Sequence, residues 1–274
     1  MEKTLDFSAS VFRLDELRHG LAHGTGKGVR IAIIDSGIEV DHPDLGGLRL
    51  LDDLHVIDGG VQIEVKPGDG SDVFGHGTAI AAVIHRIAPE AELGSIRVLS
   101  ETLGSRTAII REGVRQAIDR SYQILNCSFG CGLEQHIFQY KEWIDEAYLR
   151  DIHIVSACNN DDFTKPEWPG YFPTVITVNM ARANSDEAIY FKSGNLVEFA
   201  ARAVNVEVPW NHHSRREVTG SSFAAPVVVG LLARLLSVVK GLTPLEAKSL
   251  LRRLATPWTR AIAGQNVSYT VETI

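Results

Sequence analysis

The stretch VRIAIID, at residues 29–35, combines a run of aliphatic residues with a terminal aspartate. A short apolar run such as IAII, at 31–34 of this stretch, is typical of a strand that is buried on both faces, as in a parallel sheet. Similar runs follow along the chain: QILNCSF at 123–129, IHIVSAC at 152–158 and TVITVNM at 174–180. These segments predict the strands of one buried sheet.

Segments with a helical period separate these runs. TAIIREGVRQAIDRS at 107–121 repeats apolar residues at helical spacing, and EQHIFQYKEWIDEAYLR at 134–150 follows the same period. Strands that alternate with helices predict an α/β fold: a three-layer, doubly wound, mostly parallel sheet with helices on both faces. No internal repeat or Pro/Ser-rich linker divides the chain, so we expect residues 1–274 to form a single domain.

Composition argues against several classes of function. The net charge is −7 and no basic stripe is present, so we expect no nucleic-acid partner. The longest apolar run, at 227–239, is too short to span a bilayer and contains Arg234, so we expect no membrane association. Residues 1–20 lack the apolar core of a signal peptide. The three cysteines lack metal-site spacing, and we expect reduced thiols in a cytoplasmic protein without metal or cofactor.

Two side chains stand where a parallel sheet places its active site. Asp35 ends the first strand, and ligands bind beyond the carboxyl ends of such strands. His76 stands between two glycines in FGHGTAIAAVI (74–84), directly before small residues at helical spacing. Each also has a structural interpretation, Asp35 as a turn residue and His76 as a surface residue at a helix start.

The stretch TGSSFAAPVVVG, at 219–230, predicts a helix that begins with two serines. A serine nucleophile benefits from the first turn of a helix, where free N–H groups favour developing negative charge. We expect Pro226 to be tolerated because the N–H groups of the first turn have no intrahelical partners. An ordinary serine-capped buried helix remains the alternative.

The order of these residues narrows the choice of hydrolase. No histidine follows Ser222, which excludes the order of an α/β-hydrolase. A chymotrypsin-like order places histidine before aspartate on an all-β scaffold, which this pattern does not predict. The order Asp35, His76, Ser222 remains.

Three segments carry a family resemblance: IAIIDSGIEVDHPDL, GHGTAIAAVI and GSSFAAP. They resemble the aspartate, histidine and serine motifs of the subtilisin-like serine proteases, or subtilases, whose known order is Asp, His, Ser. The resemblance covers roughly residues 20–255. It implies a serine endopeptidase with a Ser-His-Asp triad, in which Ser222 is the nucleophile and Ser221 takes the place of the threonine in the family motif.

The resemblance also implies roles for other residues. Asn159 of SACNN would donate to the oxyanion together with the Ser222 N–H, with Asn160 as the competing choice. Cys158 replaces a family glycine there. Substrate would pair as a strand with two segments: NCSFG at 126–130, with Ser128 and Gly130, and LGSRT at 103–107, with Gly104 and Ser105.

One position bears on specificity. KPEWPGYFP, at 165–173, resembles the family segment at the base of the primary specificity pocket, with Glu167 where many members have glycine. A carboxylate in a partly dry pocket would select lysine or arginine before the scissile bond. The alternative is a reshaped loop in which Glu167 points to solvent.

Two departures from the family pattern indicate an enzyme whose activity is limited by narrow substrate specificity. The histidine helix continues through AVIHRIAPEAEL without the calcium-binding insertion of extracellular members. Asp44 matches one calcium ligand of the family, but the other ligands of that site would be missing. No large prodomain precedes IAIIDSG. We therefore expect a polypeptide substrate that is a dedicated protein or precursor peptide, rather than general turnover. A degenerate peptide-binding module and a transpeptidase or macrocyclase that uses the same acyl-enzyme are the alternatives.

Overall fold

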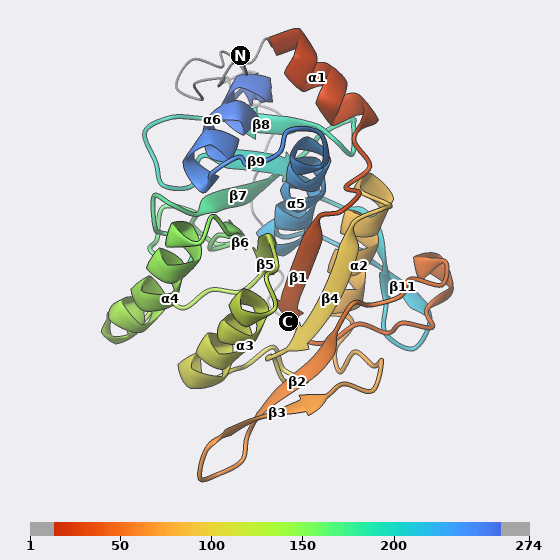
Figure 1. Cartoon of the computed structure of the whole chain (residues 1–274), viewed down its shortest axis with the longest axis vertical. Helices are drawn as coiled ribbons and strands as arrows, with labels where there is room; N and C mark the ends of the chain where they lie inside the picture. Colours follow the sequence, from red (N-terminus) through yellow and green to blue (C-terminus); the bar gives the residue numbers. More distant parts are fainter. Residues whose placement is uncertain (1–13, 259–274) are drawn as a thin grey trace, which may run out of the picture.

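The computed structural model describes residues 14–258, and a large, mostly parallel sheet runs through it (Figure 1). Its strand order is β12-β8-β9-β7-β6-β5-β1-β4-β2-β3. The strands of this sheet are β1 (Arg30–Asp35), β2 (Asp53–Asp58), β3 (Ile63–Pro67), β4 (Glu92–Arg97), β5 (Ile124–Cys127), β6 (His153–Ala157), β7 (Ile176–Ala181), β8 (Ile189–Phe191), β9 (Phe199–Arg202) and β12 (Thr256–Pro257). The pairs β2–β3 and β8–β9 are antiparallel, and the other pairs are parallel. A separate hairpin joins β10 (Val206–Trp210) to β11 (Ser214–Val218).

Helices cover both faces of the sheet, which confirms the predicted three-layer α/β class. The helices are α1 (Leu14–His23), α2 (His76–Ile87), α3 (Thr107–Asp119), α4 (Ile137–Leu149), α5 (Ser221–Val238) and α6 (Pro244–Leu254), with short 3-10 turns at η2 (Pro43–Leu45) and η3 (Glu134–His136). Alternate residues of β1 face the two layers. Ile31 and Ile33 belong to the apolar core that includes α2 and α5, while Ala32 and Ile34 belong to the core that includes α3 and α4.

The central helix α5 is nearly all apolar because other elements surround it. It is long and apolar enough to cross a membrane by composition, but 78% of its apolar window is buried inside the molecule. It packs against α2 and against the strands β5, β6, β7 and β9. Burial on all sides therefore accounts for its composition.

The carboxyl edge of the sheet collects the chemically interesting segments. Asp35 is the last residue of β1, and β1 lies between β4 and β5 in the sheet. Helices α2 and α5 begin at His76 and Ser221. Their first turns meet this edge, which is where parallel α/β sheets bind ligands.

Candidate active site

Asp35 and His76 form a buried hydrogen-bonded pair. His76 Nδ1 lies 2.8 Å from Asp35 Oδ1, and the two residues are 5% and 1% exposed. Because a carboxylate only accepts, Nδ1 carries the proton and Nε2 is left as the acceptor. Burial alone lowers the pKa of His76, but the charge of Asp35, its hydrogen bond and the charge of Asp72 together raise that pKa above its ordinary value.

Close backbone approach brings these two residues together. A Cβ on Gly77 would lie 2.1 Å from the carbonyl oxygen of Gly37, so only glycine lets α2 start this close to the turn after β1. Gly37 itself has a φ of 108°, which favours glycine. The glycines that flank the aspartate and histidine motifs thus set the spacing between the two side chains.

An aromatic ring of α5 packs against His76 and is itself held by further aromatic contacts. The rings of Phe223 and His76 meet edge to face with centroids 5.3 Å apart. Trp210 of β10 contacts Phe223 and also Phe74, which precedes α2. Since Phe223 directly follows Ser222, this packing brings the start of α5 to the His76 ring.

Ser222 stands in the first turn of α5 and exchanges hydrogen bonds with Ser128, which follows β5. The Ser222 hydroxyl donates to the Ser128 carbonyl at 3.3 Å, and the Ser128 hydroxyl donates to the Ser222 carbonyl at 3.1 Å. The Ser222 side chain must therefore rotate before it can give its proton to His76. Such rearrangement is common in structures without substrate.

Pro226 explains why the Ser222 carbonyl has no hydrogen-bond partner within helix α5. Pro226 is the sixth residue of α5 and not part of its first turn, which corrects the expectation from sequence. Residue 226 would normally donate its N–H to the carbonyl four residues earlier, which is that of Ser222, but proline has no N–H. The Ser128 hydroxyl supplies the missing donor.

Ser221 ties the nucleophile turn to the segment after β6. Its hydroxyl donates to the Cys158 carbonyl at 2.7 Å, and its backbone N–H donates to Asn160 Oδ1 at 2.8 Å. Ser221 is fully buried, so its hydroxyl stabilises the turn from the interior of the molecule.

The two adjacent asparagines point in different directions. Asn159 Nδ2 donates to Glu167 Oε1 at 2.7 Å, and its Oδ1 accepts the N–H groups of Asp161 and Asp162. Asn160 instead faces the nucleophile turn, with Nδ2 only 3.5 Å from the position that a Cβ on Gly220 would take. Among the described residues, Asn160 Nδ2 forms no hydrogen bond. This geometry favours the alternative, Asn160, over Asn159 as a donor beside Ser222.

Glu167 is half-buried and does not point away into solvent. One carboxylate oxygen accepts from Asn159, and the other lies 2.6 Å from the position of a Cβ on Gly130. The neighbouring Trp168 pairs with Cys131 in an isolated antiparallel bridge. The carboxylate therefore lies between Gly130, in the segment after β5, and Asn159, in the segment after β6.

The second predicted peptide-pairing segment forms a turn in this structure. Gly104 accepts the N–H of Ser100 at 2.9 Å, and the Ser105 hydroxyl donates to the Val98 carbonyl at 2.7 Å. Residues 103–106 are not part of a strand. They follow β4 at the same edge of the sheet as Asp35 and Ser128.

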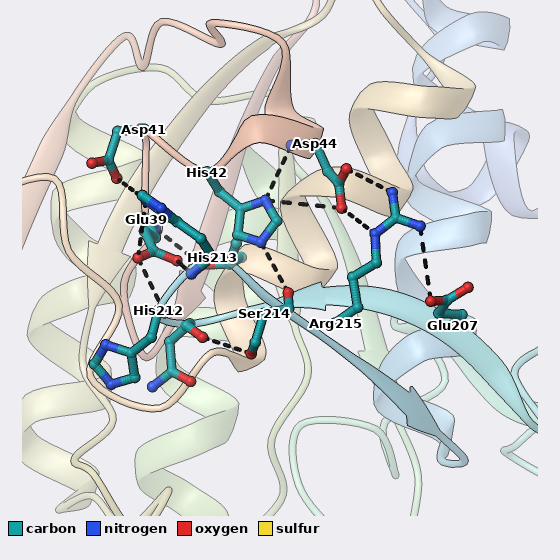
Figure 2. Close-up of polar contacts among 11 residues, drawn as sticks. Glu39, Asp41, His42, Asp44, Glu207, His212, His213, Ser214 and Arg215 are labelled. Atoms are coloured by element: carbon teal, nitrogen blue, oxygen red, sulfur yellow. Dashed lines mark hydrogen bonds and ion pairs between the residues drawn. The ribbon is translucent and has the colours of Figure 1, made fainter.

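A set of polar contacts fastens the β10–β11 hairpin to the loop after β1 (Figure 2). The Arg215 guanidinium binds both carboxylate oxygens of Asp44, at 2.8 and 2.7 Å. His42 Nε2 donates to the Ser214 carbonyl, because its Nδ1 accepts the Asp44 N–H. The Glu39 carboxylate accepts the backbone N–H groups of His212 and His213. Since this hairpin leads directly into Ser222, the contacts connect the Asp35 and Ser222 segments.

The cysteines are free thiols in this arrangement. Burial raises the pKa of Cys158 to about 12 and raises the pKa of Cys127 as well. A thiol with a raised pKa is a poor nucleophile and a poor target of oxidation. Neither of these two cysteines has the character of a reactive thiol.

Comparison with known proteins shows which family the sequence matches. The model of the subtilase family, Peptidase_S8, matches residues 26–270. Thermitase from Thermoactinomyces vulgaris is 25% identical over 77% of this chain and 76% of its own length. Subtilisin DY from Bacillus licheniformis is 25% identical over 93% of this chain and 92% of its own length. Subtilisin E from Bacillus subtilis is 27% identical over 85% of this chain, which spans 61% of that protein.

A solved structure shows the same architecture. The crystal structure of a cold adapted subtilisin-like serine proteinase superimposes with a TM-score of 0.69. The two chains are 25% identical, and the match covers 84% of this chain and 83% of the other.

Proposed function

Because the chain belongs to the subtilase family of serine proteases, we propose that it is an endopeptidase that cleaves a dedicated protein or precursor peptide through an acyl-enzyme on Ser222. The observation that carries the proposal is the buried Asp35–His76 pair, which has the start of α5 packed against its ring. A buried carboxylate–imidazole pair beside a serine in the first turn of a helix is the arrangement that acyl transfer needs.

The proton path follows from the hydrogen bonds. After rotation of its side chain, Ser222 Oγ attacks the substrate carbonyl carbon, and His76 Nε2 takes the hydroxyl proton. Asp35 holds the Nδ1–H tautomer and stabilises the imidazolium that forms. His76 then returns the proton to the leaving amine, and a water molecule hydrolyses the ester by the same route in reverse.

We propose that the Ser222 N–H and the Asn160 side chain stabilise the tetrahedral oxyanion. Asn160 Oδ1 is held by the Ser221 N–H, which directs Nδ2 toward the space beside Ser222. Asn159 would have to give up its bond to Glu167 to act there. Donors that are already oriented contribute more to the rate than donors that must reorganise.

We also propose that Glu167 selects a basic residue before the scissile bond. Its carboxylate faces Gly130, and only one of its oxygens is occupied by Asn159. No lysine or arginine side chain pairs with it among the described residues. A substrate guanidinium or ammonium would supply the countercharge.

Labelling with a fluorophosphonate probe tests the proposal. We expect the wild-type protein to be labelled and the Ser222→Ala variant to remain unlabelled, while Ser221→Ala is labelled more slowly. A profile of cleaved peptides then identifies the substrate class. Absence of labelling in folded wild-type protein would favour a peptide-binding module, and products joined to an added amine would favour a transpeptidase.

A further inference from the structure

Asp72 is a buried carboxylate in the loop before α2, and it lies just upstream of the histidine motif GHGTAIAAVI. It is 6% exposed, and within residues 14–258 no lysine or arginine forms an ion pair with it. Five donors surround its two oxygens. Oδ1 accepts from the hydroxyl of Ser36 and the N–H groups of Phe74 and Gly75, and Oδ2 accepts from the N–H and hydroxyl of Thr78.

These bonds determine where α2 begins. Gly75, the residue that caps the helix, has no side chain with which to accept the first N–H groups. Asp72 accepts one of them, that of Thr78, at 2.8 Å, and also accepts the N–H of Gly75 at 2.7 Å. His76 lies between these two anchored positions, so Asp72 fixes the backbone from both sides of His76.

The same carboxylate also reaches the Asp35 turn. The Ser36 hydroxyl donates to Asp72 Oδ1 at 2.8 Å and accepts the Gly77 N–H at 3.1 Å. The Ser36 N–H donates in turn to Asp35 Oδ1, the oxygen that bonds to His76. A continuous chain of hydrogen bonds therefore joins Asp72 to Asp35.

The charge of Asp72 is the second contribution. Among the described residues, the charged side chains that act on the His76 ring are Asp35, at the end of β1, and Asp72, in the loop before α2. Phe223 of α5 contributes an uncharged, apolar ring that contacts the His76 ring. Both carboxylates favour the imidazolium, which is the form that appears when Ser222 attacks.

We propose that Asp72 is a positioning residue for the hydrolytic reaction. It holds His76 and Asp35 in their relative positions, and its negative charge stabilises the imidazolium form of His76. The inference rests on the proposed function, because it assumes that His76 takes a proton in the reaction. It assigns no contact between Asp72 and substrate.

The test is the pH profile of kcat/KM for Asp72→Asn. His76 must be neutral to act as a base, so activity rises through the pKa of His76. Loss of a nearby negative charge disfavours the imidazolium, and we expect the acid limb to move to lower pH. We expect kcat to fall by about 10²-fold, with a smaller change in KM, because small displacements of a catalytic base have effects of this size.

Two control variants separate charge from structure. Asp44→Asn removes the same charge from the ion pair with Arg215, and we expect its acid limb to coincide with that of the wild type. Ser36→Ala keeps the charge of Asp72 but breaks its link to the Asp35 turn. We expect that variant to lose kcat without a shift of the limb, and it serves also if Asp72→Asn does not fold.

Two results would overturn the inference: an acid limb of Asp72→Asn that coincides with the wild-type limb, or an unchanged kcat in Ser36→Ala. Titration of the His76 ring N–H by NMR reports the same shift without any assay of activity. Wild-type protein that neither cleaves peptides nor reacts with the probe would reject the proposed function. A shift of the His76 titration in Asp72→Asn would then still support the electrostatic part of the inference.

Discussion

The hydroxyl of Ser128 donates to the carbonyl of Ser222 at 3.1 Å, in the place of the backbone N–H that Pro226 lacks. The segment that follows β5 is thereby bonded directly to the first turn of α5. Because Ser222 also donates its hydroxyl to the Ser128 carbonyl, the two residues hold each other in a defined arrangement before substrate arrives.

Replacement of Ser128 by alanine tests this relationship. The variant leaves the Ser222 carbonyl without a donor, and such a loss typically costs about 1 kcal/mol. We expect kcat/KM to fall roughly fivefold if that cost is expressed in the transition state. Steady-state kinetics on one peptide measures it, and Ser237→Ala, which loses a bond to the Arg234 carbonyl near the other end of α5, is the matched control. A loss beyond 10³-fold would mean that Ser128 takes part in the chemistry itself.

The adjacent asparagines give a second prediction. We expect Asn160→Ala to lower kcat by about 10²–10³-fold with little change in KM, as is typical for loss of an oxyanion donor. Asn160→Asp keeps the acceptor for the Ser221 N–H but removes the Nδ2 donor, so it should be at least as impaired.

Asn159→Ala is the comparison for these variants. It releases Glu167 without touching the nucleophile turn, so we expect kcat to change by less than about tenfold. A larger loss of kcat in Asn159→Ala than in Asn160→Ala would return the oxyanion role to Asn159.

Much of the fold could be read from local pattern. The run at 29–35 is apolar because β1 is buried by helices on both faces, and Asp35 was conspicuous as the polar residue at its end. The sequence also predicts His76 and Ser222 as site residues, because each stands at a helix start that glycine and small residues mark.

The finer parts of the site depend on contacts that no local pattern encodes. Asp44 and Arg215 are 171 residues apart, and the sequence around either residue does not indicate the other. Asn159 and Asn160 have the same chemistry, so only the course of the turn after β6 distinguishes them. Asp72 resembles any loop aspartate until its five donors are assembled around it.

The Asp44–Arg215 pair predicts a pH-dependent contribution to stability. The hydrogen bond from Arg215 lowers the pKa of Asp44, so the ionised carboxylate stabilises the folded state. That contribution is present above the ordinary pKa of an aspartate and is lost as pH falls through the lowered pKa. We therefore expect Arg215→Met to lower Tm slightly at neutral pH and to match the wild type in strong acid. An equal loss of Tm at both pH values would contradict the ion-pair explanation.

Chelation tests the expected independence from calcium. In the described structure, the Asp44 carboxylate is engaged at both oxygens by Arg215. We expect EDTA to leave Tm and activity of the wild type unchanged. A large fall in Tm on chelation, reversed by added calcium, would reveal a metal site and contradict this expectation.

The proposed preference for a basic residue before the scissile bond depends on Glu167 and can be tested with a variant of the same size. Glu167→Gln keeps the side-chain size and an oxygen that can accept from Asn159, but it loses the negative charge. We expect the wild type to cleave a peptide with lysine before the scissile bond about 10- to 100-fold better than one with leucine, the range of one desolvated charge-assisted bond. In Glu167→Gln that ratio should fall toward one, mainly through poorer cleavage after lysine. Equal cleavage after lysine and leucine by the wild type, or an unchanged ratio in the variant, would mean that the carboxylate serves only to hold Asn159.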